Sequence, residues 1–434
     1  VAYDATRQRA FVVSGGADTL SVVDVSTAAN PAVVGTPLQD ASVLQGACGV
    51  AHDDTRELAF VASGDASSLA VVDTSSTTPT LEGVVVDSTA LDGAVGVCYD
   101  GTRQRVIVVS ERADSLSVVD VSTAASPSVQ GHVADASSLN GATGVACDAS
   151  SQLAFVASAA GDSLTVVDVR DPAAPSVLGT VSDAARLGGA SSVSFDAASQ
   201  RAFVASANSD SLAVVDVSDP ARPVLIGSFT DATNLDGAAG VHYDAPTRRA
   251  IVVSQVADSL GVVCMPNELL ASRIPNPPPR PSPPPFPPPQ PPPFPPPRPP
   301  TKPPSSPSPP PSPPSPPLPP GVCGEDLALA GSQADAVNLL GAVAVTYDAA
   351  NERALVASPD ADSLSVVDVS DPTGPAVVGV ATDGASLDGA CGVAYDATRQ
   401  RAFVVSGGAD TLSVVDVSTA ANPAVVGTPL QDAS

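Results

Sequence analysis

Aspartate recurs at fixed places along this chain of 434 residues, and its carboxylates are the side chains best placed to bind a ligand. One set closes a turn of small residues, as in SGGAD (14–18). A ring of such carboxylates could hold Ca²⁺, which takes about six to eight oxygen ligands, or could face a basic partner. The set comprises Asp18, Asp114, Asp162, Asp210, Asp258, Asp362 and Asp410.

The turn positions favour a structural role for these carboxylates. No DxDxDG loop accompanies them, and Asp commonly caps turns through its own side chain. We therefore interpret them as turn caps, with an acidic binding face as the alternative, and we predict no metal or cofactor. Two further sets have the same interpretation. They are Asp40, Asp87, Asp135, Asp183, Asp231, Asp335, Asp383 and Asp432, and Asp24, Asp73, Asp120, Asp168, Asp216, Asp368 and Asp416.

Histidine offers little for catalysis. His52, His132 and His242 lie in different registers of the repeat described below, and His52 stands where other units carry Tyr. No HExxH, GxSxG or GxxxxGK[ST] motif occurs. We predict no catalytic residue and a protein that is not an enzyme.

The six cysteines form no CxxC pair. Cys264 and Cys323 flank a proline-rich stretch, and in a secreted protein we expect them to form a disulfide, worth on the order of 4 kcal/mol in the chain-entropy model. The other four, Cys48, Cys98, Cys147 and Cys391, are interpreted as small buried thiols.

Charge excludes some partners. The formal net charge is −27 and there is a single Lys, Lys302, so binding to nucleic acid is not expected. Arginines gather in one kind of turn, which we interpret as a solvated edge, with a docking face for acidic polysaccharide as the alternative. They are Arg7, Arg9, Arg56, Arg103, Arg105, Arg201, Arg248, Arg249, Arg353, Arg399 and Arg401.

The elements that carry these residues repeat with a period of about 48 residues. The phrase ADTLSVVDVS (17–26) returns in closely similar form at 113–122, 209–218 and 361–370, and eight units open on Val followed by Asp. Each unit holds four Val-rich runs bounded by turn residues, which indicates strands. The runs are apolar on both faces, so neighbouring sheets should stack. The predicted fold is an all-β propeller of about eight four-stranded antiparallel blades.

Residues 393–434 repeat residues 1–42 without a difference. Seven blades plus one surplus blade, or a fragment of a tandem array, therefore remain as alternatives. A closed ring of eight is favoured because every blade needs a neighbour on both faces. The start at Val1 and the single Met265 predict a fragment or a processed product.

A proline tract interrupts the sixth unit. We predict blades one to five and the first half of blade six in residues 1–264, a proline-rich insertion or linker in 265–321, and the second half of blade six with blades seven and eight of the same propeller in 322–434. Pro fixes φ and lacks an N–H, so the tract should be a polyproline II rod, on the order of 140 Å long at about 3.1 Å per residue. No apolar run approaches the roughly 18 residues of a membrane-spanning helix.

Two resemblances follow. The phrase SLxVVDVSDPxxPxxxG at 211–227 and 363–379 resembles the LVIVD-type repeat, and GVAYD with AFVVS is similar to the YVTN-type propeller repeats of surface-layer proteins. Both imply a propeller with an interaction surface. SPSPPPSPPSPP (306–317) resembles the hydroxyproline-rich segments of pherophorin-like wall glycoproteins of green algae and plants, which implies hydroxylation and O-linked glycans. An unmodified spacer or PxxP ligand is the alternative.

Three functions are weighed. The leading hypothesis is a secreted, non-enzymatic binding or scaffold protein of a cell wall or extracellular matrix, with a protein or polysaccharide partner and the proline tract as spacer or glycosylated tether. The second is an intracellular propeller that serves as a protein-interaction platform. The third is a propeller enzyme, such as a lactonase or a quinoprotein-like oxidoreductase, which needs ligands converging on the channel.

Overall fold

A computed structural model describes residues 2–4, 6–24, 32–33, 35–76, 78–266, 328–409, 411–427 and 429–431. These residues belong to one compact unit, Val1–Ser272 with Pro320–Ser434. The other unit, Arg273–Pro319, lies outside the described residues, and so do the predicted polyproline II conformation, Cys323, Asp410 and Asp432.

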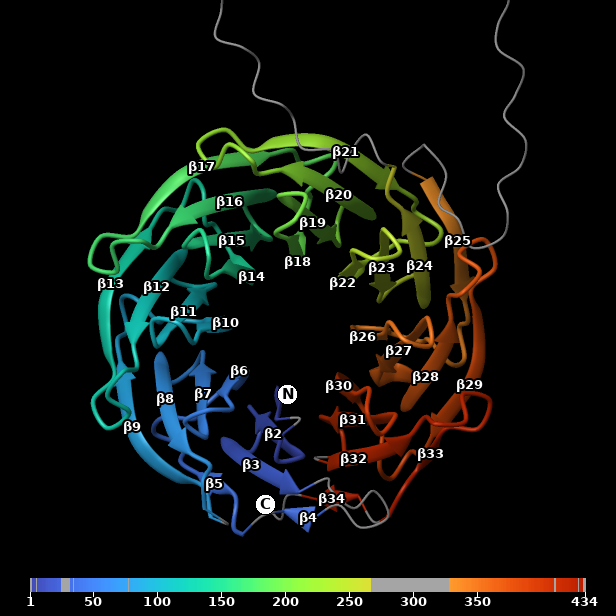
Figure 1. Ribbon diagram of the computed structural model, residues 1–434, viewed down its shortest axis with the longest axis horizontal. Coiled ribbons are helices and arrows are strands. Elements are labelled where there is room, and N and C mark those ends of the chain that lie inside the picture. The colour runs from blue at the N-terminus through green and yellow to red at the C-terminus, as the bar shows by residue number, and fades with distance from the viewer. Residues whose placement is uncertain are drawn as a thin grey trace, which may run out of the picture. The chain divides into compact units, whose positions relative to one another are not determined.

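Eight antiparallel sheets stand in a closed ring, with the first strand of each nearest the axis (Figure 1). The first strands are β1 (Ala2–Asp4), β6 (Ala47–Asp53), β10 (Ala94–Asp100), β14 (Ala142–Asp148), β18 (Ala190–Asp196), β22 (Ala238–Asp244), β26 (Ala344–Asp348) and β30 (Ala390–Asp396). The second strands are β2 (Arg9–Ser14), β7 (Leu58–Ser63), β11 (Arg105–Ser110), β15 (Leu153–Ser158), β19 (Arg201–Ser206), β23 (Arg249–Ser254), β27 (Arg353–Ser358) and β31 (Arg401–Ser406).

The third strands are β3 (Thr19–Asp24), β8 (Ser68–Asp73), β12 (Ser115–Asp120), β16 (Ser163–Asp168), β20 (Ser211–Asp216), β24 (Ser259–Cys264), β28 (Ser363–Asp368) and β32 (Thr411–Asp416). The outer strands are β4 (Ala32–Val33) with β5 (Leu38–Gln39), β9 (Thr80–Val86), β13 (Ser128–Ala134), β17 (Ser176–Ser182), β21 (Val224–Thr230), β25 (Ala328–Ala334), β29 (Ala376–Thr382), and β33 (Ala424–Val425) with β34 (Leu430–Gln431). The predicted eight-bladed propeller is confirmed, and we number the blades one to eight in chain order.

In blades two to seven the second and third strands are buried along nearly their whole length. Every residue of β19 and β20 is buried, whereas outer strand β13 alternates between exposed and half-buried residues. A central strand that is sandwiched between two neighbouring blades has no polar face, which explains the continuous apolar runs. Among the described residues the only helix is a single 3₁₀ turn, Pro359–Ala361 (η1), and none is long and apolar enough to cross a membrane.

The sixth blade is completed from beyond the proline tract. β24 pairs with β25 in antiparallel register, with Cys264 opposite Ala328. The two strands are separated in sequence by residues 265–327, so the chain leaves and re-enters this blade between its third and fourth strands.

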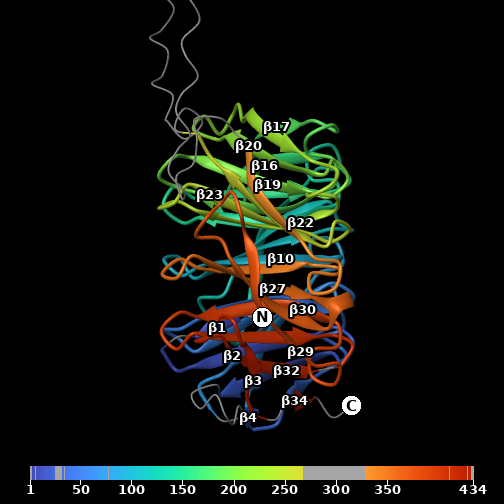
Figure 2. The ribbon, with the colours of Figure 1, turned by 90° about the vertical axis from the view of Figure 1, so that its right-hand side faces the viewer.

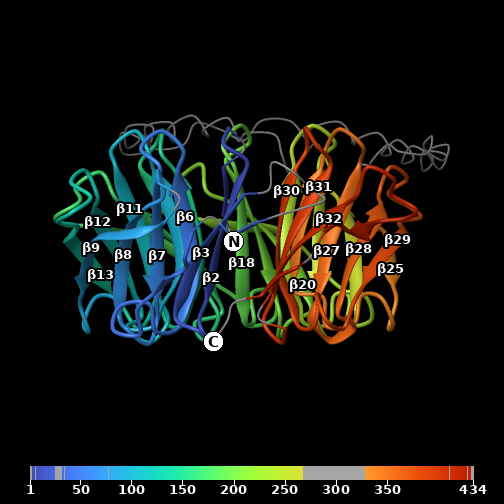
Figure 3. The same cartoon turned by 90° about the horizontal axis from the view of Figure 1, so that it is seen from below.

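The turns gather on two opposite rims of the ring (Figures 2 and 3). One rim is formed by the second-to-third turns, which carry the set of aspartates that begins with Asp18, and by the fourth-to-first loops, which carry the set that begins with Asp40. We call it the acidic rim, and we call these aspartates the Asp18 set and the Asp40 set. The arginine rim is formed by the first-to-second and third-to-fourth turns. The antiparallel order of each blade fixes this division.

Candidate functional site: the acidic rim

The Asp18 set forms hydrogen bonds that link consecutive turns and loops of the acidic rim. In six blades the Oδ1 atom of this Asp accepts a hydrogen bond, of 2.7 to 3.2 Å, from the N–H of a glycine in the next fourth-to-first loop. The pairs are Asp18–Gly46, Asp114–Gly141, Asp162–Gly189, Asp210–Gly237, Asp258–Gly341 and Asp362–Gly389. These hydrogen bonds agree with the predicted capping role, and each Asp remains half-buried.

Backbone conformation explains the residue types. The six Asp residues have φ between 47° and 56°, and their glycine partners have φ between 65° and 71°. Asp tolerates this left-handed region through local hydrogen bonds, and Gly enters it without steric cost. In blade two Ser67 stands in the Asp position, with φ 50°.

The Asp40 set caps the loops that follow the outer strands. Asp40 Oδ1 accepts from the Ser42 N–H at 2.9 Å, and Asp135 and Asp231 accept equivalently from Ser137 and Thr233. A hydrogen bond from the Ser42 hydroxyl is the first cause of the lowered pKa of Asp40. Six members of the Asp24 set act in the same way at the ends of third strands, as Asp120 does for Ser122 at 2.8 Å. They are Asp73, Asp120, Asp168, Asp216, Asp368 and Asp416.

Negative charge is concentrated on this rim. Desolvation, followed by the charge of Asp210, raises the pKa of Asp236. Arg112 bridges Asp92 at 2.8 Å and Asp65 at 3.1 Å, both exposed. Many carboxylates of this rim therefore accept structural hydrogen bonds or pair with an arginine.

Four of the arginines that begin second strands bond to a neighbouring blade, so the solvated-edge interpretation is wrong for them. Each of the four donates to the carbonyl that follows the third strand of the next blade: Arg9 to Thr74 at 2.6 Å, Arg105 to Val169 at 3.2 Å, Arg249 to Val369 at 2.7 Å and Arg353 to Val417 at 3.5 Å. Arg201 pairs with Asp216 of its own blade at 2.8 Å. In blade two Leu58 stands in the Arg position, and Arg56 reaches Val121 O at 2.7 Å instead. Guanidinium groups that are buried or bonded to a neighbouring blade are poor candidates for a docking face.

A Tyr from each of several first strands adds a second contact between blades. The Tyr99 hydroxyl donates to Asp53 at 2.5 Å, and Tyr3 and Tyr395 donate to Asp396 and Asp348 at 2.7 Å. Burial and then the bond to Asp53 raise the pKa of Tyr99 to about 12. Burial opposes ionisation of Asp53, but the bonds from Tyr99 and Arg56 prevail and lower its pKa.

His52 occupies the equivalent place in blade two. Its ring stacks on Phe11 with centroids 3.8 Å apart, as Tyr99 packs on Phe60 at 4.7 Å. Together with Asp4 and Asp54 it forms the single group of metal-ligand type among the described residues. Nδ1 lies 2.8 Å from Asp54 and Nε2 lies 3.3 Å from Thr74 Oγ1, so both nitrogens have protein partners and the group is an inter-blade contact.

The cysteine predictions need correction. Cys98 on β10 and Cys147 on β14 form a disulfide between blades three and four, and are not separate thiols. Cys48 and Cys391 are free and exposed, not buried. Cys264 is buried at the end of β24, and because Cys323 lies outside the described residues, their pairing stays a prediction.

Comparison with known proteins agrees with this architecture. The LVIVD repeat family matches residues 147–183, 201–231 and 354–383. The chain carries LVIVD repeats. Each match covers the third strand of its blade and most or all of the fourth, in blades four, five and seven. No curated protein matches the chain.

Several solved structures share the fold. The C-terminal WD40 domain of Sif2 superposes with a TM-score of 0.62 at 10% identity, over 93% of this chain and 91% of that one. The periplasmic gluconolactonase PpgL of Pseudomonas aeruginosa gives 0.55 at 12% identity, over 83% and 92%. A functionally unknown protein from Desulfotomaculum acetoxidans gives 0.56 at 10%, over 85% and 98%. These similarities establish the propeller fold.

Proposed function

We propose that this protein is a non-enzymatic binding propeller of an extracellular matrix or cell wall, with the proline tract as spacer or glycosylated tether. The observation that carries the proposal is the Cys98–Cys147 disulfide, because such bonds persist in oxidising compartments and are rare in the cytosol. The Ser-Pro composition of residues 306–317 supports the same location.

The acidic rim is the proposed binding surface. Its Asp residues recur around the ring and are half-buried, so a partner with spaced basic groups can meet several of them at once. The net charge of −27 would steer such a partner toward the protein, and this attraction should weaken with salt. The partner class is a basic segment of a matrix protein.

Chemical analysis of the native protein tests the location. We expect hydroxyproline in the proline tract and recovery of the Cys98–Cys147 peptide pair in a non-reducing peptide map; the same map reports on Cys264 and Cys323. Unmodified proline together with free thiols at all six positions would favour the intracellular alternative.

Binding is tested with poly-L-lysine as the basic probe. The triple variant Asp114→Asn, Asp162→Asn and Asp210→Asn removes three charges, while each amide oxygen can still accept the glycine N–H. We expect severalfold weaker binding at low salt with little change in melting temperature. The matched control Asp171→Asn, Asp219→Asn and Asp371→Asn removes equal charge from exposed turns of the arginine rim. Equal losses in both triples would show that the rim has no special role.

A further inference from the structure

Blade four differs from the other blades in one repeated position. Six second strands begin with an arginine: Arg9, Arg105, Arg201, Arg249, Arg353 and Arg401. In blade two Leu58 stands at this position, and Arg56, two residues earlier, supplies the guanidinium group. Blade four has Leu153 and Ser151 at the two positions. It is therefore the one unit in the sequence with no guanidinium group at this place.

The interface between blades two and three shows how such a guanidinium group is bound. Arg56 Nε donates to Asp53 Oδ2 at 2.7 Å, and its two Nη atoms donate to Val121 O at 2.7 Å and to the Tyr99 hydroxyl at 2.9 Å. Its Cζ atom lies 5.9 Å from the ring centroids of both Phe60 and Tyr99, within the range of cation–π attraction. A carboxylate, a carbonyl and two aromatic rings thus surround the cation.

The same four positions line a cavity between blades four and five, which are neighbours in the ring (Figure 1). The cavity has a volume of about 240 Å³. Asp148, Phe155, Phe195 and Val217 line it, and they are the equivalents of Asp53, Phe60, Tyr99 and Val121 in that order. The rings of Phe155 and Phe195 stack with centroids 4.2 Å apart, as Phe60 and Tyr99 pack at 4.7 Å. The cavity therefore has the walls of the Arg56 site without its arginine.

The carboxylate of Asp148 can accept a further hydrogen bond. Asp53 Oδ2 accepts two, from Arg56 and Tyr99, whereas Asp148 Oδ2 accepts the Ser151 hydroxyl at 2.6 Å, and a carboxylate oxygen has two lone pairs. Burial opposes ionisation of Asp148, but the hydrogen bonds from Ser150 and Ser151 prevail and lower its pKa. Asp148 is thus a charged acceptor at neutral pH.

The cavity opens to solvent on the arginine rim. Ser151, Gln200 and Ser218, which come from turns of this rim, line it and are exposed. Arg170 also lines it, but its guanidinium group pairs with Asp168, with Nε 2.9 Å from Oδ1 and Nη2 2.5 Å from Oδ2. The cation on the cavity wall therefore has a carboxylate of its own, and the charge of Asp148 is left to attract a ligand.

We propose that this cavity binds the guanidinium group of an arginine side chain on a partner protein. The group donates to the Asp148 carboxylate and the Val217 carbonyl, and its plane lies against Phe155 and Phe195. Arginine is favoured over lysine because its planar fork of donors reaches both acceptors at once and stacks on aromatic rings. The site lies on the rim opposite the acidic rim, so the inference is independent of the proposed function.

The test uses the 434-residue chain and a fluorescent Gly-Gly-Arg-Gly-Gly peptide, followed by fluorescence anisotropy at about 0.15 M salt, where the Debye length is about 8 Å. We expect saturable binding of one peptide per chain. Matched peptides carry citrulline, which has the same shape without the charge, or lysine, and both should bind about tenfold more weakly or less, because hydrogen bonds to charged groups are lost or misplaced. Equal binding of the citrulline peptide, or no binding of the arginine peptide, would overturn the proposal.

A variant of the protein locates the site. Ser151→Arg gives blade four the residue that blade two has at position 56, so its own guanidinium group should fill the cavity, weaken peptide binding by about tenfold or more and raise the melting temperature. The matched control Ser126→Arg adds the same charge to an exposed turn of the same rim and should change neither. Undiminished binding to Ser151→Arg would place the peptide elsewhere and contradict the proposal. The citrulline comparison uses the parent chain, so it decides whether or not the variant folds.

Discussion

At the scale of single residues, the Arg201–Asp216 pair shows how polar groups support the blades. The two side chains lie 2.8 Å apart and are 1% and 5% exposed. They are cross-strand partners in blade five. Removing one partner of a buried pair leaves an uncompensated charge, which costs about 3–5 kcal/mol.

We therefore predict that Arg201→Ala lowers the free energy of unfolding by about 3–5 kcal/mol, measured by urea denaturation. Arg222→Ala, at an exposed turn of the same blade, is the control and should change it by less than about 0.5 kcal/mol. Similar values for both variants would mean that the pair contributes little.

The buried carboxylates at first-strand ends predict a stability that depends on acid. Burial opposes ionisation of Asp53, Asp100 and Asp396, but their hydrogen bonds lower the pKa of each below the ordinary value. A carboxylate with a lowered folded-state pKa stabilises the fold above its unfolded pKa of about 3.9, and this contribution is lost as the pH falls further through the folded pKa.

Unfolding free energy measured by urea titration from pH 7 to pH 2.5 should thus stay level to about pH 5 and then fall. Asp53→Asn should lower stability at pH 7 and make the acid decline shallower. An unchanged slope in that variant would remove Asp53 from the explanation.

At the scale of elements, proline accounts for the one irregular blade pattern. Blades one and eight carry Pro37 and Pro429 where other outer strands continue. Pro has no N–H for the ladder, and each outer strand is split into two short pieces that pair with the same third strand. Blades one and eight, which pack against each other, therefore both have interrupted outer strands.

The disulfide joins two neighbouring inner strands, β10 and β14, across 49 residues of sequence. In the chain-entropy model a loop of this size is worth about 4 kcal/mol. We predict that a reducing agent lowers the melting temperature, measured by circular dichroism, and that the Cys98→Ala and Cys147→Ala double variant loses this response.

The Cys48→Ala and Cys391→Ala double variant supplies the control. Both of these cysteines are free, so it should respond to reduction as the parent does. A melting temperature that is insensitive to reduction in the parent protein would contradict the stabilising role of the Cys98–Cys147 bond.

The sequence predicts elements of this fold far better than contacts between them. Val-rich runs at a 48-residue period suffice for the blades because each run has its turns beside it. The hydrogen bond from Arg9 to Thr74 and the Cys98–Cys147 disulfide depend on how one blade packs against the next. Cys98 lies opposite Ile107 and Cys147 opposite Ala154, one register position apart in their blades, so repeat alignment alone does not pair them.

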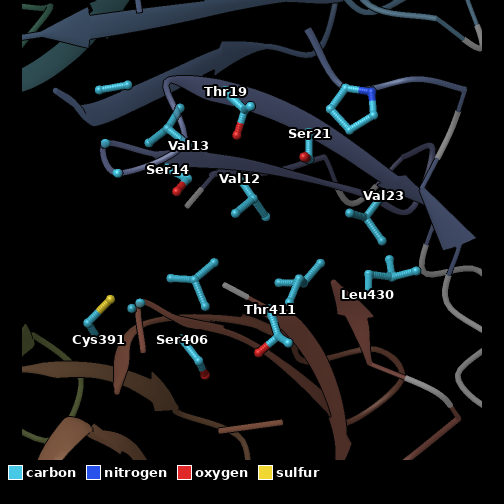
Figure 4. A pocket seen from close by; sticks show the side chains of 18 of the residues that line it. Val12, Val13, Ser14, Thr19, Ser21, Val23, Cys391, Ser406, Thr411 and Leu430 are labelled. Atoms are coloured by element: carbon cyan, nitrogen blue, oxygen red, sulfur yellow. The ribbon is translucent and has the colours of Figure 1, made fainter. Parts of the chain in front are cut away.

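At the scale of the whole molecule, the two identical stretches, residues 1–42 and 393–434, belong to neighbouring blades. Blades one and eight carry this shared sequence and pack against each other. Blade one is followed by the loop with Leu44, which closes its interface with blade two. A cavity of about 480 Å³, lined by Val12, Val23 and Leu430 among others, lies between blades eight and one (Figure 4). The described residues therefore pack less closely at this interface than at the others.

This unevenness predicts where the ring opens first. Stability in a repeat array is the sum of unit and interface terms. Among the described residues, the interface between blades eight and one buries about half as many apolar side chains as the others. Amide hydrogen exchange should therefore be faster in β2, β3, β31 and β32 than in β15, β16, β19 and β20, under conditions where exchange proceeds by local opening. Mass spectrometry of peptic fragments measures this, with blades four and five as the internal reference. Uniform exchange around the ring would contradict this prediction, because it would mean that the interface between blades eight and one is as stable as the others.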